Sequence, residues 1–379
     1  MSGPRALRQS FALRFGSGTF LALWCLIAAF PIFWIAVMSV KAPLDAFADS
    51  PWTVLTGPAT LAAGKGLSLL DLLILAAFAA LTAWAATRPL PRVVAKLGPP
   101  LAGWILGSAA FAALWLAVAV WVLGPLLNLD TTLGLGPLIG FTIEHYQTVW
   151  VERAFWENFL NSVYVTLGVT VVSLTVGTFA GYALSRAGST LAFAILIAAL
   201  VFRALPHSVL VTGYLPFFIT SSEWLAPVFG ANAPTLYGQP LAVIAVLVAI
   251  NQPFTIWMLR SFFQSIPSEL DEAARVDGCT HFQAFRWVIM PVMWPGVITT
   301  GLFSFLLGYN DYLVTSLLLD ASNQTMVPAI ASFFNRETTT TDQVLAVAAA
   351  VSITAPLFLL VMVFQRQIVS GLTAGAVKG

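Results

Sequence analysis

The chain has 379 residues, of which 59% are hydrophobic and only 9% are charged, and its mean hydropathy is +0.89. Because a soluble domain carries about 25% charged residues, a soluble fold is excluded and lipid must serve as part of the solvent of this chain. The net charge of +1 gives no indication of a nucleic-acid partner, and the two cysteines and three histidines show no disulfide or metal-ligand spacing.

Runs of about 20 apolar residues, each long enough to cross the membrane, predict eight transmembrane helices and hence an all-α polytopic membrane protein. They lie near residues 19–40, 67–86, 101–126, 159–184, 191–220, 241–259, 296–316 and 344–364. The first run is too long for a cleaved signal peptide. With the N-terminus inside, most of the 17 Lys and Arg residues fall on cytoplasmic segments, so both termini are predicted to be cytoplasmic.

The predicted helices divide the chain into a core and an insertion. The expected parts are a cytoplasmic N-terminus (1–18), a first helix (19–40), an insertion with outer loops (41–158), a core (159–368) and a cytoplasmic tail (369–379). Within the insertion, residues 67–126 form a predicted hairpin of two helices that are rich in Ala, Leu and Trp. Nearly unbroken apolar faces indicate a peripheral hairpin that faces lipid.

The run 191–220 is too long for one straight crossing and is interrupted by Arg203-Ala204-Leu205-Pro206. Proline removes a backbone donor and disfavours helix before it, so a kink or an unwound turn is expected. Arg203 is the basic residue inside a predicted span, where charges are costly and face protein or a cavity. We expect Arg203 and Pro206 to be structural, with Arg203 either snorkelling to the membrane surface or binding carbonyls freed by Pro206, and substrate contact is the alternative.

The longest polar cytoplasmic segment, residues 260–295, is predicted to contain two short helices. Ser268 and Asp271 resemble a capping box at the start of the first, and Gly278 supplies a left-handed stop. Thr280 with Gln283 opens the second helix.

The second of these short helices is expected to place Phe282, Phe285 and Ile289 on one face. Pro291 is expected to end it. An apolar face on a cytoplasmic helix pair predicts a partner to pack against.

The same segment resembles a known signature. Glu272-Ala273-Ala274, then Gly278, then Val288-x-Met290-Pro291, is similar to the EAA motif of the membrane subunits of bacterial ABC importers, with Val288 and Met290 in place of Ile and Leu. Further similarities to maltose-type (MalG-like) sugar permeases lie at residues 158–162, 181–186, 253–260, 263–270, 309–312 and 371–379. The length and the inserted hairpin look most like alpha-glucoside permeases of the AglG kind.

This resemblance implies a non-catalytic permease subunit of a sugar importer in a bacterial inner membrane, with six core helices. Its implied partners are a second homologous permease, an ATPase homodimer, an extracytoplasmic sugar-binding protein and membrane lipid. No cofactor is expected in this chain, because ATP and Mg would be bound by the partner ATPase. The chain has no phosphate-binding Gly-x-x-x-x-Gly-Lys-Ser/Thr loop of its own.

The resemblance also implies contact residues. The ATPase would be coupled through Glu272, Ala273, Ala274, Gly278 and Pro291. The tail would contact the ATPase at Gly375, Lys378 and Gly379, and its glycines predict no stable free helix there. The outer segment 317–343 would reach the binding protein, at Asn335, Arg336, Glu337 and Thr339.

Polar residues within or beside the spans are candidates for the substrate pathway, because aromatic rings beside amides or carboxylates can stack on and hydrogen-bond a sugar. They are Asn251, Gln252, Tyr309, Asn310, Asp311 and Tyr312. Hydrogen bonding to the partner permease explains Asn310 and Asp311 equally well.

Two other functional classes are considered. A secondary active transporter of a small polar solute would show paired broken helices and intramembrane carboxylates, whereas one clear break and one deeper carboxylate, Asp311, are present. An intramembrane hydrolase would need a nucleophile and a base within the spans, and His207 has no obvious partner in the sequence.

Overall fold

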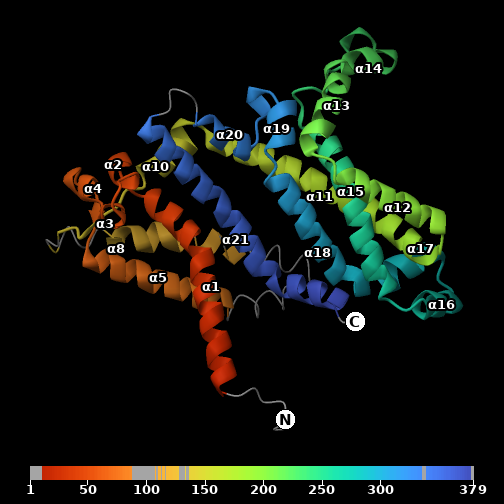
Figure 1. Ribbon diagram of the computed structural model, residues 1–379, viewed down its shortest axis with the longest axis horizontal. Helices are drawn as coiled ribbons and strands as arrows, with labels where there is room; N and C mark the ends of the chain where they lie inside the picture. The colour runs from red at the N-terminus through yellow and green to blue at the C-terminus, as the bar shows by residue number, and fades with distance from the viewer. Residues whose placement is uncertain are drawn as a thin grey trace. The chain divides into compact units, whose positions relative to one another are not determined.

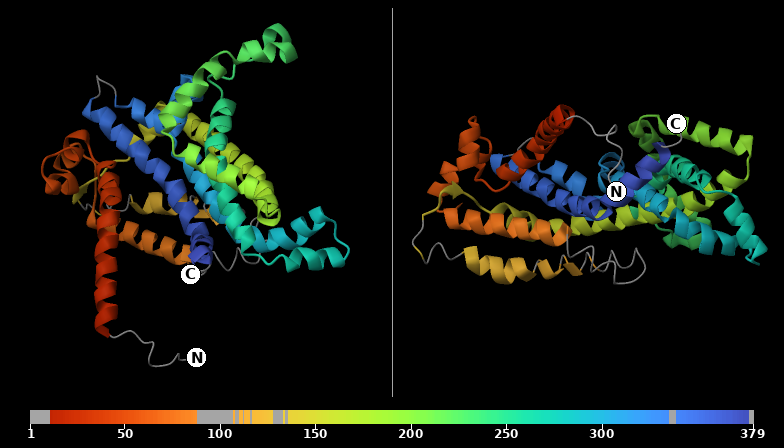
Figure 2. Two further views of the ribbon diagram at one scale, coloured as in Figure 1. Left: turned by 45° about the vertical axis from the view of Figure 1, so that its right-hand side comes forward. Right: turned by 90° about the horizontal axis from the view of Figure 1, so that it is seen from below.

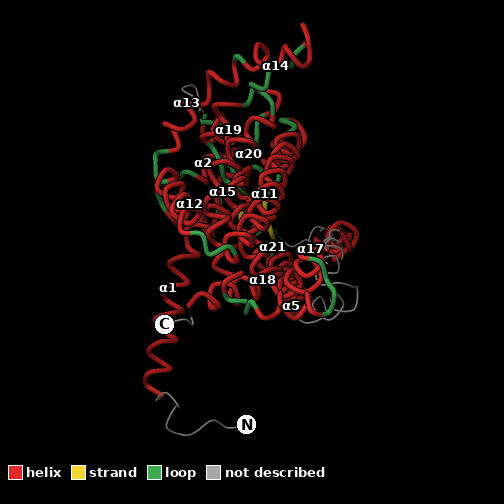
Figure 3. Tube along the Cα trace, turned by 90° about the vertical axis from the view of Figure 1, so that its right-hand side faces the viewer, coloured by secondary structure: helices red, strands yellow, loops and turns green. Residues whose placement is uncertain are grey.

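The computed structural model describes residues 11–87, 107, 110–111, 113–115, 117–127, 133, 136–334 and 339–376. Helices dominate (Figure 1), and within these residues the named strands are two short segments, coloured yellow in Figure 3. The chain forms two compact units. Unit 1 comprises Met1–Glu152 with Phe333–Pro356, and unit 2 comprises Arg153–Ser332 with Leu357–Gly379.

Five helices of the described chain are long and apolar enough to cross a membrane, or six crossings if one bent pair counts as a span. The five are Phe15–Met38, Phe155–Arg186, Pro240–Gln264, His281–Tyr309 and Thr340–Gln365. The prediction of an all-α polytopic membrane protein is therefore confirmed. The number eight is not, because the apolar stretch Leu69–Ala85 is shorter than a span and much of 101–126 lies outside the described residues.

Unit 1 holds the predicted hairpin and the segments that flank it. Its elements are α1 (Phe11–Met38), α2 (Pro43–Ala46), α3 (Pro51–Thr56), α4 (Pro58–Ala62), β1 (Gly66–Leu67), α5 (Leu69–Thr87), η2 (Ala119–Leu123), α8 (Gly124–Leu127), β2 (Ile139–Gly140), α10 (Glu144–Gln147), η3 (Thr148–Glu152) and the first part of α21 (Thr340–Ala376). The two arms of the hairpin meet where Trp115 Nε1 donates to Thr82 Oγ1 over 2.6 Å.

The base of the hairpin is closed by β1 and β2, which pair antiparallel in the register Leu67↔Ile139. Beside this pair, the buried Lys41 ammonium donates to the carbonyl oxygens of Leu55 (2.8 Å) and Gly140 (2.5 Å). Burial lowers the pKa of Lys41, and the nearby Asp45 carboxylate opposes that shift. Since residues about 100 positions apart meet here, the segments on both sides of the hairpin fold as one structure.

Unit 2 is a helix bundle. Its elements are α11 (Phe155–Arg186), α12 (Thr190–Arg203), α13 (His207–Ile219), α14 (Ser221–Phe229), η4 (Gly230–Asn232), α15 (Pro240–Gln264), α16 (Glu269–Val276), α17 (His281–Ala284), η5 (Phe285–Ile289), α18 (Met290–Tyr309), α19 (Leu313–Leu318), η6 (Ala321–Asn323), α20 (Met326–Ser332) and the end of α21. The long helices α11, α15 and α18 pack side by side (Figure 1).

The break predicted at Pro206 is confirmed. The helix α12 ends at Arg203, α13 begins at His207, and the two meet at an angle of 97°. Pro206 has no N–H to continue the ladder and disfavours a helical residue before it, so the chain turns here.

Glycines let α11 approach its two neighbours. A Cβ on Gly177 would lie 2.6 Å from Thr255 Cγ2 of α15, and one on Gly301 of α18 would lie 2.9 Å from Leu174 Cδ1. Without a hydrophobic driving force between helices in lipid, close packing of small residues is a main source of helix association. The bundle therefore depends on these positions having no side chain.

We expect Gly177→Ala to destabilise the bundle, because Thr255 is fully buried and its branched side chain has no room to move. Overpacking costs about 1–3 kcal/mol, of which the higher helix propensity of alanine returns about 1 kcal/mol. The measurement is the midpoint of thermal aggregation of the purified protein in detergent.

The matched control is Gly213→Ala, at a helical glycine with open space around it. It should leave the midpoint unchanged or raise it. Equal midpoints for the two variants would contradict the close-packing account.

Candidate functional site

The segment from Ser265 to Ile289, here called the EAA loop, projects from one end of the bundle between α15 and α18 (teal in Figure 2). Its first helix, α16, was predicted, and so was the left-handed turn: Gly278 has a φ of +90°. The second part differs from the prediction. It begins at His281 and continues through η5 and α18 as one apolar helical stretch to Tyr309.

The prediction that Pro291 ends the second helix is wrong. Pro291 lies in the first turn of α18, directly after the π-helical turn η5. Because η5 runs directly into α18, Pro291 is interior to a continuous helical stretch, and the wider π turn before it accommodates its missing N–H.

The two predicted capping boxes have different outcomes. Thr280 and Gln283 form one, with Thr280 N donating to Gln283 Oε1 (2.8 Å) and Gln283 N to Thr280 Oγ1 (3.3 Å). Ser268 does not cap α16, because its backbone is already helical and its side chain makes no capping bond. Its supposed partner Asp271 binds elsewhere.

The apolar side chains predicted to share one face of the second helix are only partly buried. Phe285 and Ile289 are buried in a cluster with Phe263 of α15, whereas Phe282 is 58% exposed. Val276, at the end of α16, is 87% exposed.

The EAA signature residues are divided in the same way. Ala274 is buried, while Glu272, Ala273, Gly278 and Pro291 are exposed. The loop therefore exposes the apolar side chains of Val276 and Phe282 beside the Glu272 carboxylate, and exposed apolar side chains with polar residues around them indicate contact with another protein.

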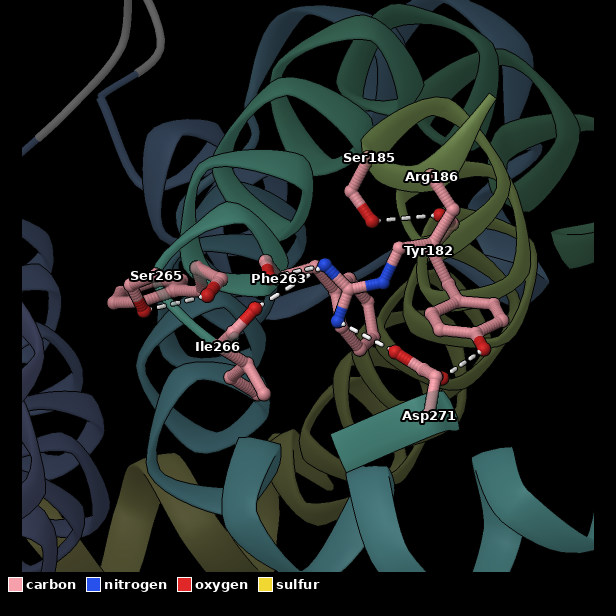
Figure 4. A network of polar contacts seen from close by, with 8 residues as sticks. Tyr182, Ser185, Arg186, Phe263, Ser265, Ile266 and Asp271 are labelled. Carbon is pink, nitrogen blue, oxygen red and sulfur yellow. Dashed lines mark hydrogen bonds and ion pairs between the residues drawn. The ribbon is translucent and has the colours of Figure 1, made fainter. Parts of the chain in front are cut away.

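A polar network that sequence reasoning did not predict holds α16 to the bundle (Figure 4). Asp271 Oδ1 accepts from the Tyr182 hydroxyl over 2.5 Å, and Asp271 Oδ2 pairs with Arg186 Nη2 at 2.8 Å. Arg186 Nη1 also donates to the carbonyls of Phe263 (3.4 Å) and Ile266 (3.2 Å). The signal in the sequence that could have indicated it was Arg186 at the end of one span and the acidic first turn of α16 in a later polar segment predicted to lie on the same side of the membrane.

The structure does not gather the pathway candidates around one open site. Asn251 is buried and donates to Ser304 Oγ at 2.8 Å, which joins α15 to α18. Gln252 donates to the Ser173 carbonyl of α11 at 3.4 Å. Both amides bind neighbouring helices of the same chain, and their place in a pathway stays a prediction.

The second group of pathway candidates lies where α18 ends. Tyr309 is buried, and its ring stacks on that of Phe305 with 5.4 Å between the ring centres. At the start of α19, Asp311 Oδ1 accepts a hydrogen bond from Thr315 N over 2.9 Å. Asn310 and Tyr312 are exposed. These two are the members of the group that are open to a ligand or to another chain.

Arg203 lies at the end of α12, and its guanidinium carbon is 4.8 Å from the ring centre of Phe254 on α15. Its described partner is thus an aromatic ring, a favourable cation–π contact, rather than the carbonyls freed by Pro206. Pro206 forms the turn that follows, as predicted.

Of the proposed contact loop, Asn335, Arg336 and Glu337 lie outside the described residues. Thr339 caps α21, since its hydroxyl accepts from Asp342 N over 3.2 Å. In the tail, Gly375 belongs to α21, which continues to Ala376, so this part of the tail is the end of a long helix and not a free one. Lys378 and Gly379 lie outside the described residues.

Comparisons with known proteins cover this site. The family described as "Binding-protein-dependent transport system inner membrane component" matches residues 173–373, which include the whole EAA loop. The trehalose transport system permease protein SugB of Mycobacterium tuberculosis is 32% identical over 264 residues, covering 69% of this chain and 91% of the relative.

Two further similarities extend this result. The diacetylchitobiose uptake system permease protein DasC of Streptomyces coelicolor is 34% identical over 240 residues, covering 63% of this chain and 81% of the relative. In fold, the chain is similar to a bacterial ABC transporter that imports the acidic polysaccharide alginate, with a TM-score of 0.55, 18% identity, and coverage of 95% of this chain and 98% of that chain.

Gly278 should be required for its backbone conformation and not for its size, because open space surrounds it. We expect Gly278→Asn to keep the turn, since Asn tolerates positive φ, and Gly278→Val to cost about 1–2 kcal/mol. Hydrogen exchange of residues 272–283 measures the outcome. Equal protection in the two variants would contradict this explanation.

Proposed function

Because the chain belongs to the binding-protein-dependent transport system inner membrane component family, we propose that it is the permease subunit of an ATP-driven importer that carries a di- or oligosaccharide. In this proposal the chain provides part of the translocation pathway and has no catalytic step of its own. ATP hydrolysis takes place on a separate ATPase.

The observation that carries the proposal is the surface of the EAA loop. Exposed Glu272 and Ala273 lie on α16 next to exposed Val276, and Asp271 fixes the same helix to the bundle. A helix that is anchored on one side and open on the other can transmit force from a bound partner to the membrane helices. A self-contained secondary transporter has no need for such a surface.

The sugar class rests on the relatives. SugB is named for trehalose, DasC for diacetylchitobiose, and a Bacillus subtilis permease, 30% identical over 242 residues, for maltodextrin. All three names are di- or oligosaccharides, so this is the class that we propose. An alpha-glucoside is the narrower expectation.

The proposed complex contains this chain, a second homologous permease, two ATPase subunits and an extracytoplasmic sugar-binding protein. Both termini and the EAA loop are on the cytoplasmic side, in agreement with the excess of Lys and Arg on the segments assigned to that side. The segment before α21 faces the binding protein.

The test is reconstitution. The chain is purified with its genetically neighbouring transporter subunits and placed in proteoliposomes with ATP inside and the binding protein outside. Uptake of labelled trehalose, maltose, maltotriose and diacetylchitobiose is measured. ATP-dependent uptake of a sugar supports the proposal, whereas uptake driven by an ion gradient without ATP overturns it.

We expect Glu272→Lys to abolish ATPase binding and to lower uptake at least tenfold, while the chain still accumulates in the membrane. In this proposal Glu272 pairs with a basic group of the ATPase, so reversing its charge leaves two like charges facing each other. Copurification of the ATPase and sugar uptake are the measurements.

The matched control is Glu223→Lys, which reverses an exposed carboxylate in the first turn of another helix, α14. It should keep both ATPase binding and uptake. Wild-type transport by the Glu272 variant would contradict the interface, and so would a loss that merely follows the amount of permease in the membrane.

A further inference from the structure

The carboxylate of Asp271 joins α16 to α11. Its two oxygens bind different residues, the Tyr182 hydroxyl and the Arg186 guanidinium, both from the last two turns of α11. The Asp271 side chain is 15% exposed and that of Arg186 is 22% exposed. The pair is thus largely shielded from water. Removing one partner of such a pair is destabilising, because the other charge is left without compensation.

Arg186 extends this contact to α15. Its Nη1 donates to the carbonyls of Phe263 and Ile266, which lie at and just after the end of that helix. The last carbonyls of a helix have no intrahelical donor, and a cationic side chain is favourable there. One guanidinium therefore joins the ends of α11 and α15 to the first turn of α16.

Tyr182 extends it to the second half of the EAA loop. Its ring lies edge-on to that of Phe263, with 5.4 Å between the ring centres, and is tilted against that of Phe285 of η5, with 4.8 Å between the ring centres. With its hydroxyl on Asp271, this side chain contacts the end of α15, α16 and η5 at once. The first helix of the loop and η5 are thus both in contact with the end of α11.

Asp271 and Glu272 are consecutive residues with opposite environments. On a helix, neighbouring side chains diverge by about 100°, so Asp271 faces the bundle while Glu272 is exposed. Simple packing would not require a charge here, because apolar residues of similar volume are often as stabilising as a buried ion pair. The geometry is fixed by the directional hydrogen bonds, from the Tyr182 hydroxyl to Asp271 Oδ1 and from Arg186 Nη1 to the two carbonyls, and the ion pair of Arg186 Nη2 with Asp271 Oδ2 adds charge attraction to them.

We propose that Tyr182, Arg186 and Asp271, here called the junction, position the EAA loop. The junction makes the loop move as one rigid body with the C-terminal ends of α11 and α15 during transport. This inference rests on the proposed function and adds to it the residues that transmit the movement. Without the junction, an ATPase still binds the exposed face of α16, but the loop moves relative to α11 and α15 and does not transmit the movement of the ATPase to them. ATP is then hydrolysed without matching sugar movement.

The experiment uses the whole transporter in lipid nanodiscs and proteoliposomes, with the sugar that the uptake panel identifies. Its variants are Tyr182→Phe, Asp271→Ala, Asp271→Asn and the double variant Tyr182→Phe/Asp271→Ala. The control is Tyr164→Phe, which removes the hydroxyl of a 56%-exposed tyrosine on the same helix. The readouts are sugar transported per ATP hydrolysed, ATPase copurification and hydrogen exchange of residues 268–280.

We expect Tyr182→Phe to lower the sugar-to-ATP ratio at least threefold and Asp271→Ala at least tenfold, with the ATPase still copurifying and with faster exchange in α16. The double variant should equal Asp271→Ala, because the hydroxyl has no partner once the carboxylate is gone. Asp271→Asn retains an acceptor for Tyr182 and loses the charge for Arg186, so it should lie between Tyr182→Phe and Asp271→Ala. The Tyr164 control should match the wild type.

Wild-type ratios and exchange in the Tyr182 and Asp271 variants would overturn the junction, and so would additive losses in the double variant. The two proposals fail differently. If the unaltered transporter shows no ATP-dependent uptake, the proposed function fails. The exchange measurement still decides whether Tyr182 and Asp271 hold the loop.

Discussion

The close contact between α11 and α15 is the constraint on which the rest of unit 2 depends. A Cβ on Gly181 would lie 3.0 Å from the backbone nitrogen of Arg260, so the two helices touch almost backbone to backbone one turn from their ends. This approach brings Arg186 within reach of the carbonyls that end α15 and of Asp271. The position of the EAA loop thus depends on glycine at such contacts between α11 and α15. That position in turn determines which face of α16 is exposed.

Local signals in the sequence predicted much of this structure. Apolar runs indicated the long helices, Pro206 the break, Gly278 the left-handed turn, and Thr280 with Gln283 the capping box, because each of these depends on neighbouring residues alone. The same local reasoning placed Asp271 in a capping box. Its actual partners, on α11, are 85–89 positions away, a distance at which local rules carry no information.

The other differences have the same origin. Asn251 was assigned to a pathway by residue type, which stays a prediction, and its bond to Ser304 on another helix had no local signal in the sequence. Pro291 was expected to stop a helix, yet a π turn before it lets the helix continue. In unit 1, the contact of Lys41 with Gly140 spans the whole hairpin and shows no local pattern. The function proposed for the EAA loop rests on family resemblance, whereas the structure shows how the loop is held.

The central claim is that the exposed face of α16 binds an ATPase. A photoreactive amino acid at Val276, the most exposed apolar residue of that helix, tests it in native membranes that contain the whole transporter. The account predicts a crosslink between this chain and the ATPase subunit, which is lost in the Glu272→Lys background. Crosslinks only to lipid, to the binding protein or within the chain itself would contradict it.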